Sequence, residues 1–314
     1  MKRKTTRTAM ITAAALVLAL AAACGDTPGS SSTGDPSGSP EAVVMLMQRV
    51  EPGSFMLGEN LGTTPTDGPL NWDAPPLTPV TLTQGFYMGR YPVTRQQWID
   101  VMGEGIPGWS TALPNAQESA AGGDINRRPA THMSWYDAIV FANLLSMANG
   151  LAPAYEIECA DNGELTTNPA RWGTVPTNSG DPSRPRWDNA QIAVGSDGYR
   201  LPTNEQWEFA AKGGNTADSY TFSGSDIVGD VAWTVANSGN SPRMVGLLDA
   251  NGLEIHDMSG NVWEWAQDWQ GDLRVVRGGV WNLAMFSARS VSRGASYPYI
   301  RGNYTGFRLA RPAH

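Results

Sequence analysis

Glycine and proline are the feature that most constrains what this chain can fold into. The 314 residues include 35 glycines and 22 prolines, together about 18% of the chain against roughly 12% in average proteins. Both residue types interrupt regular helices and strands and favour turns. The sequence therefore predicts short elements joined by long loops, and it argues against a helical bundle. A hydrophobic content of 41% is still enough for a packed core.

Residues 1–23 have the features of an export signal. Basic residues at positions 2–4 precede an apolar run over residues 9–23, which is too short to span a bilayer and fits a signal-peptide core. The run ends at Cys24, and this junction resembles a bacterial lipoprotein signal, in which the cysteine is lipidated. Leu20 lies four residues before the cysteine, whereas such signals usually have leucine three before. Ordinary secretion with an incidental cysteine is the alternative.

Residues 24–42 are expected to form a lipidated cysteine and a flexible spacer. Positions 25–40 consist of Gly, Asp, Thr, Pro and Ser with no apolar side chain to bury. Removal of residues 1–23 takes away four positive charges, so the net charge of −8 becomes −12. This acidic balance argues against a nucleic-acid partner. If Cys24 is acylated, Cys159 is the remaining thiol. We expect an exported, lipid-anchored protein of the bacterial cell envelope.

Residues 43–314 are predicted to form one α+β domain. Strands are expected over residues 44–50 and 54–57 and between residues 79 and 91. Helices are expected after Thr94, Ser134 and Thr203, because each can cap a first turn. Residues 150–198 are rich in Asn, Pro, Gly and Asp and are predicted to be a long surface insertion.

Four ordered motifs identify a family resemblance. They are EPGSFMLG (51–58), GYRLPTNEQWEFAAKGG (198–214), DMSGNVWEW (257–265), and RGG (277–279) with GFRL (306–309). In this order they resemble the formylglycine-generating enzyme, or sulfatase-modifying factor, domain family. The resemblance implies an irregular α+β fold of the C-type-lectin-like kind, with short strands, a few helices and long loops. That fold agrees with the excess of glycine and proline.

The resemblance also implies what chemistry to expect. The family's enzymes bind copper through two cysteines just after the RGG motif, and these positions are Leu283 and Ala288 here. Neither side chain can bind copper, since soft thiolates select Cu(I), and Cys159 lies far from the motif. We therefore expect no copper and no formylglycine-generating activity. A second branch of the family uses nonheme iron, but the three histidines are widely separated in this sequence.

A structural calcium ion is the metal that the resemblance favours. Family members bind Ca²⁺ in the motif found here at residues 257–265, and Ca²⁺ prefers hard oxygen ligands. Carried over position by position, the ligands are Asp257, Gly260, Val262 and Glu264. The alternative is that Asp257 and Glu264 cap turns or pair with arginines.

Residues 273–314 contain seven arginines and no Asp or Glu. Arg277 and Arg308 belong to family motifs, so we expect them to pair with buried acids. The other arginines lie among aromatic residues, and Arg, Tyr and Trp carry much of the binding energy at recognition surfaces. The candidate ligand-binding residues are Trp281, Phe286, Arg289, Arg293, Tyr297, Tyr299, Arg301 and Tyr304. The alternative is that several of these aromatic side chains belong to the core.

A further resemblance concerns the same segment. Some C-type-lectin-like lipoproteins are diversified by retroelements that rewrite adenines near a GFR motif, and residues 283–305 contain none of the Lys, Glu, Gln or Trp that such rewriting cannot produce. Met285 would then be an unvaried position. The leading hypothesis is an anchored, non-catalytic protein that binds a protein or glycan through residues 281–305, with some preference for anionic groups. The alternatives are a family enzyme or maturation factor with unidentified chemistry, and a structural envelope component.

Overall fold

Three capped helices anchor the described part of the chain. The computed structural model describes residues 43–59, 76–103, 123–216 and 219–313, so the predicted signal and spacer lie outside it. The helices are α1 (Arg95–Met102), α3 (Trp135–Ala148) and α5 (Asn204–Ala211). Their N-caps are Thr94, Ser134 and Thr203, and in each case the residue three positions later completes a capping box. These three helix starts were predicted from the sequence and are confirmed.

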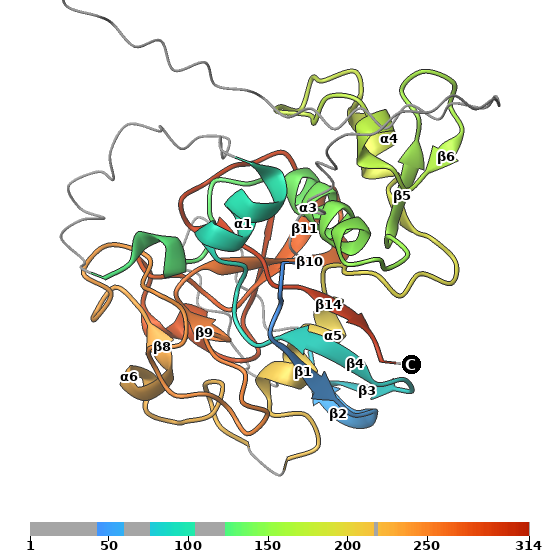
Figure 1. The fold of residues 1–314 in the computed structure, drawn as a ribbon. Helices are drawn as coiled ribbons and strands as arrows, with labels where there is room; N and C mark the ends of the chain where they lie inside the picture. Colours follow the sequence, from blue (N-terminus) through green and yellow to red (C-terminus); the bar gives the residue numbers. More distant parts are fainter. Residues whose placement is uncertain (1–42, 60–75, 104–122, 217–218, 314) are drawn as a thin grey trace, which may run out of the picture. The chain divides into compact units, whose positions relative to one another are not determined.

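A four-stranded sheet occupies the centre of the domain (Figure 1). Its order is β12-β11-β10-β13, with β10 (Trp263–Gln270), β11 (Leu273–Arg277), β12 (Arg293–Ser296) and β13 (Thr305–Gly306). The inner pair β10–β11 is antiparallel, and β10 pairs with β13 in parallel. The motifs at 257–265 and 277–279 therefore meet through neighbouring strands of one sheet.

The remaining strands form smaller sheets around this centre. β1 (Met47–Val50) and β14 (Ala310–Pro312) flank β4 (Phe86–Gly89), and β2 (Gly53–Leu57) pairs with β3 (Thr78–Leu82). β8 (Ala232–Trp233) pairs with β9 (Ser259–Gly260). Outside residues 150–198 there are also three single helical turns: η1 (Ile125–Arg127), α6 (Val228–Val231) and η3 (Met285–Ala288).

The insertion at residues 150–198 has a sheet and a core of its own. Its elements are β5 (Tyr155–Glu158), β6 (Leu165–Thr166), η2 (Pro169–Arg171), α4 (Arg184–Asp188) and β7 (Gln191–Ile192), and Figure 1 shows β5, β6 and α4 together. Trp172 and Trp187 are fully buried and meet edge to face, with 5.7 Å between ring centres. Trp187 also meets Tyr136 of α3 at 5.7 Å. The polar composition predicted only a surface loop, whereas two tryptophans attach this region to the main core.

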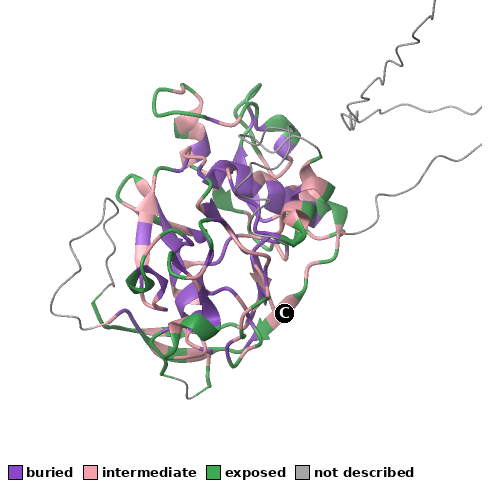
Figure 2. Ribbon diagram, turned by 90° about the vertical axis from the view of Figure 1, so that its left-hand side faces the viewer, coloured by how far each residue is buried: buried purple, intermediate pink, exposed green. Residues whose placement is uncertain are grey.

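Buried residues lie mainly in the helices and the central sheet, and exposed residues lie mainly on the loops (Figure 2). The main core includes Trp98 and Phe141, stacked 5.4 Å apart, and Phe307, which meets both rings. The expected irregular α+β fold is confirmed. Within the described ranges, no helix is both long and apolar enough to cross a bilayer.

Candidate ligand-binding surface

A buried ion pair lies beneath the region that follows the RGG motif. Arg308 donates from Nε and Nη2 to the two carboxylate oxygens of Glu264, at 2.6 and 2.7 Å, and both side chains are fully buried. The indole of Trp207 donates to Glu264 as well, at 2.7 Å. Burial of unpaired charge is costly, so these donors make the carboxylate tolerable in the core. The sequence expectation for Arg308 is confirmed.

A second buried pair joins helix α5 to the same region. Arg277 binds Glu208, both fully buried, and Glu208 also accepts from Lys212 at 2.7 Å. The other end of Arg277 donates to the carbonyls of Val291 and Ser292, at 3.0 and 2.9 Å. Arg277 therefore fixes the backbone that leads into β12, and its expected pairing with a core acid is confirmed.

The two glycines after Arg277 allow η3 to approach the sheet. Gly278 and Gly279 have φ values of 94° and 80°, a region that favours glycine. A Cβ on Gly279 would lie 2.5 Å from the carbonyl oxygen of Ser287. Only a residue without a side chain lets η3 pack here. The RGG motif therefore supplies the arginine of a buried ion pair and the glycine against which η3 packs.

The η3 turn presents apolar side chains on a fixed backbone. Met285 and Phe286 are 44% and 52% exposed. The carbonyl of Phe286 accepts from Ser292 Oγ at 2.8 Å and from Arg289 Nε at 3.3 Å, and Ser287 Oγ donates to the carbonyl of Ala284 at 2.9 Å. Side-chain hydrogen bonds thus hold the turn while its large apolar groups face solvent.

The predicted ligand-binding residues divide into exposed, intermediate and buried groups. Phe286 and Tyr297 are exposed, whereas Trp281 is only 7% exposed and packs in the main core. The remaining predicted positions are intermediate: Arg289, Arg293, Tyr299, Arg301 and Tyr304. Trp281 therefore supports the surface from below. Asn282, Met285 and Asn303 are exposed in the same segment and were missed, because selection by Arg and aromatic type ignores them.

Most of the positive charge in this segment is internally paired. Besides Arg277 and Arg308, Arg289 binds Glu59 at 2.9 Å, and Arg301 grips Asp137 through Nε and Nη2 at 2.7 and 2.8 Å. A further arginine, Arg274, is 2% exposed. Five of the seven arginines are therefore paired or buried, and the expected preference for anionic ligands stays a prediction.

Arg274 is buried between two tryptophans. Its guanidinium carbon lies 3.6 Å from the ring centres of both Trp135 and Trp269. Burial lowers the pKa of Arg274 to about 9, so the side chain remains cationic at neutral pH. The stack clamps β11 against α3.

Two of the four positions expected to bind calcium, Asp257 and Glu264, are engaged by protein groups. Glu264 is bound by Arg308, and the carboxylate of Asp257 accepts from Gly246 N at 2.7 Å and Asn261 Nδ2 at 3.1 Å. Burial raises the pKa of Asp257. Gly260 and Val262 are buried. The two carboxylates are thus bound by protein donors, and no group of three or more His, Cys, Asp or Glu side chains that could hold a metal gathers among the described residues. Calcium binding stays a prediction from the resemblance.

The positions that would carry the copper thiolates are part of the packing. Ala288 is fully buried in a small cluster with Phe222, Val231 and Ala232, and Leu283 packs against the main core. Cys159 is buried and free. Leu283 and Ala288 supply no ligand atoms for copper.

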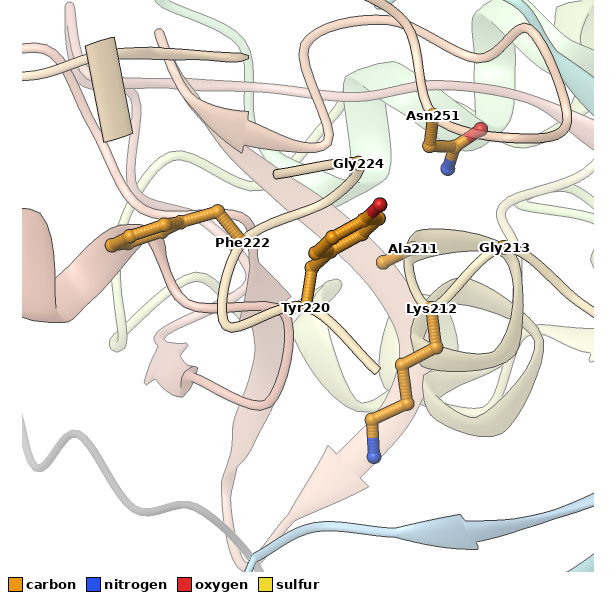
Figure 3. Close-up of a pocket in the computed structure, with 7 residues that line it drawn as sticks. All are labelled: Ala211, Lys212, Gly213, Tyr220, Phe222, Gly224 and Asn251. Carbon is orange, nitrogen blue, oxygen red and sulfur yellow. The ribbon is translucent and has the colours of Figure 1, made fainter. Parts of the chain in front are cut away.

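One hollow near α5 is closed to ligands. It is lined by Ala211, Lys212, Gly213, Tyr220, Phe222, Gly224 and Asn251 (Figure 3). The space leaves no volume for a water molecule. A more open hollow of about 340 Å³ lies in the insertion, around Arg184 and Asp188.

Comparisons with known proteins agree with this architecture. The chaperone protein LppX of Paenibacillus barcinonensis is 33% identical over 243 residues, which are 70% of this chain and 75% of the relative. The inactive Cα-formylglycine-generating enzyme 2 of Bos taurus is 33% identical over 148 residues, covering 40% of this chain and 48% of that protein. The solved structure of Treponema denticola variable protein 1 superposes with a TM-score of 0.69 at 27% identity, covering 85% of this chain and 95% of the other.

The family model described as "Sulfatase-modifying factor enzyme 1-like domain" matches residues 33–313. This range includes every described element and all of the motifs discussed above. The chain belongs to the sulfatase-modifying factor enzyme 1-like domain family.

Proposed function

We propose that this protein is a non-catalytic binding protein, anchored in the cell envelope, whose ligand contacts the surface of residues 281–305. The observation that carries the proposal is the pair Met285 and Phe286, both about half exposed on a backbone held by side-chain hydrogen bonds. Exposed apolar groups are useful at binding surfaces. A fixed backbone reduces the entropy lost on binding.

The residues at the two positions that correspond to the family's copper-binding cysteines support a non-catalytic role. Leu283 and Ala288 pack against the two hydrophobic clusters, and neither can serve as a thiolate. A relative whose printed name is "Inactive C-alpha-formylglycine-generating enzyme 2" is 33% identical to this chain over 148 residues. Coexpression with a sulfatase, followed by mass spectrometry of the target cysteine, should show no loss of 18 Da; an aldehyde-containing peptide would contradict this part of the proposal.

Photo-crosslinking tests the surface directly. A photoreactive amino acid at position 286, in cells that make the full chain, should form a covalent adduct with an envelope component. The same amino acid at position 227 is the matched control, because Ile227 is 65% exposed but lies outside residues 281–305. Adducts at 227 and none at 286 would contradict the proposal.

Anchoring through Cys24 is a separate part of the proposal. Substitution Cys24→Ser should abolish incorporation of a labelled fatty acid and move the protein from the membrane fraction to the soluble fraction. Unchanged fractionation of the variant would show that another feature holds the protein at the membrane.

A chaperone is the second candidate function. The observation that favours it is the 33% identity to the chaperone protein LppX over 75% of that relative. A chaperone should suppress aggregation of a heat-denatured model enzyme, and Met285→Ser with Phe286→Ser should weaken this effect. A selective binding protein should form the crosslink at 286 and leave aggregation unchanged.

A further inference from the structure

The hollow in the insertion, around Arg184 and Asp188, has the size of a small-molecule site. It is lined by Ser179, Gly180, Asp181, Pro182, Arg184, Pro185 and Asp188, and its volume is about 340 Å³. Small-molecule pockets typically enclose roughly 300–1,000 Å³. The lining offers hydroxyl, carboxylate and guanidinium groups beside the flat apolar faces of two prolines.

The charged groups of this hollow are held in place by contacts with neighbouring side chains. Arg184 forms an ion pair with Asp188, with 3.0 Å between Nε and Oδ2, and the two side chains are 22% and 23% exposed. The hydroxyl of Tyr136 donates to the other oxygen of Asp188. Burial and the hydrogen bond to Asp188 raise the pKa of Tyr136, so this hydroxyl stays protonated. Asp181 is oriented by Ser183, which donates to it from N at 2.9 Å and from Oγ at 2.7 Å.

Two stacked tyrosines of the 281–305 segment lie next to Arg184, at one side of the hollow. The guanidinium of Arg184 lies 5.6 Å from the ring centre of Tyr299. Tyr299 stacks on Tyr297 with 5.3 Å between centres and 14° between planes, and Tyr297 is 47% exposed. The carbonyl of Pro298, between them, accepts from the backbone N–H of Trp135 at 2.9 Å. The aromatic pair therefore stands on a backbone fixed to the start of α3.

We propose that the hollow around Arg184 and the Tyr297–Tyr299 pair form one site for a neutral saccharide. Sugar hydroxyls both donate and accept hydrogen bonds, so they match adjacent carboxylate and guanidinium groups. The C–H face of a sugar ring can pack on an exposed tyrosine or on proline. An anionic ligand would face Asp181 and Asp188, and a cationic one would face Arg184. A neutral polyhydroxyl ligand avoids both repulsions.

This inference rests in part on the proposed function, because Tyr297 and Tyr299 belong to residues 281–305, but the site needs no contact from Met285 or Phe286. The test is an array of neutral, sialylated and sulfated oligosaccharides, probed with the full chain processed at residue 24 and kept in detergent. We expect retention on neutral oligosaccharides. Binding should persist in EDTA, since protein side chains alone make the site.

Two substitutions locate the binding. Tyr297→Ala should weaken binding to the best oligosaccharide at least about tenfold, the size expected for loss of an aromatic contact, and Tyr297→Phe should retain it. Arg184→Gln should weaken binding to a similar degree. Tyr220→Ala is the matched control, because Tyr220 is 45% exposed but does not line this hollow.

Several outcomes would overturn the saccharide site. They are no retained oligosaccharide, retention of only charged ones, loss of binding in EDTA, or equal binding by the Tyr297→Ala and Arg184→Gln variants. None of these results affects the crosslink at position 286, so failure of this site and failure of the proposed function are distinguishable.

Discussion

The buried arginines of the C-terminal region differ sharply from those at its rim. Arg277 and Arg308 form ion pairs in which both side chains are fully buried. Arg289 and Arg301 pair with Glu59 and Asp137, but one or both partners keep contact with solvent. The first two hold the sheet that supports the surface, and the other two lie beside the exposed side chains. Burial, and not residue type, decides which arginines are structural.

The largest effect should follow from removing a buried arginine. Arg308→Met leaves Glu264 charged and without its ion-pair partner in the core, and such losses cost about 3–5 kcal/mol of unfolding free energy. Urea denaturation followed by tryptophan fluorescence measures this. The double variant Glu264→Gln/Arg308→Met should recover part of the stability. If Arg308→Met were as stable as the parent protein, the distinction between buried and rim arginines would be wrong.

A somewhat smaller loss of unfolding free energy is expected when a side chain is added at Gly279, where η3 packs against the backbone. Gly279→Ala introduces a Cβ at 2.5 Å from the carbonyl oxygen of Ser287 at φ 80°, so both backbone strain and a clash oppose folding. We expect a loss of at least about 2 kcal/mol. Gly271→Ala is the matched control: its φ is 60°, but nothing lies within 4 Å of the added Cβ, so only about 1 kcal/mol should be lost. Equal losses would show that η3 does not rest on Gly279.

Removal of a rim arginine should cost less. Arg301→Ala breaks the two-point contact with Asp137, yet Asp137 keeps its hydrogen bonds from Ser134 at the start of α3. We expect a loss of about 1 kcal/mol, between values for exposed and buried pairs. A double-mutant cycle with Asp137→Asn gives the pair energy. An Arg301–Asp137 pair energy as large as the loss expected for Arg308→Met would contradict the distinction between rim and buried arginines.

The smallest effect on stability should come from the exposed residues themselves. Met285→Ser and Phe286→Ser should change the free energy of unfolding by no more than about 0.5 kcal/mol, because exposed positions outside special contacts are tolerant. Thermal unfolding followed by circular dichroism measures the change. A loss above 2 kcal/mol would mean that these side chains support the core and are not available for a ligand.

Local signals, and the pairing of the two motif arginines Arg277 and Arg308 with buried acids, were read correctly from the sequence, whereas other long-range contacts were not. The capping boxes at Thr94, Ser134 and Thr203 involve residues three positions apart, so a single sequence reveals them. The burial of Trp281 and the pairing of Arg301 with Asp137 depend on contacts across 22 and 164 positions. No local pattern encodes such contacts. The same holds for Trp172 and Trp187, which give the insertion a core that its polar composition conceals.

The position of strand β4 limits the order in which parts of the domain can form during synthesis. It pairs with β1 on one side and β14 on the other, and Arg308 donates to the carbonyl of Gly89, 219 positions away, at 3.0 Å. Distant contacts form only after the intervening chain has closed on itself. A nascent chain that has not yet reached residue 308 therefore carries Glu264 without its partner and β4 with one open edge. The β1-β4-β14 sheet and the Glu264–Arg308 pair therefore cannot be complete before this last stretch of the chain has been synthesised.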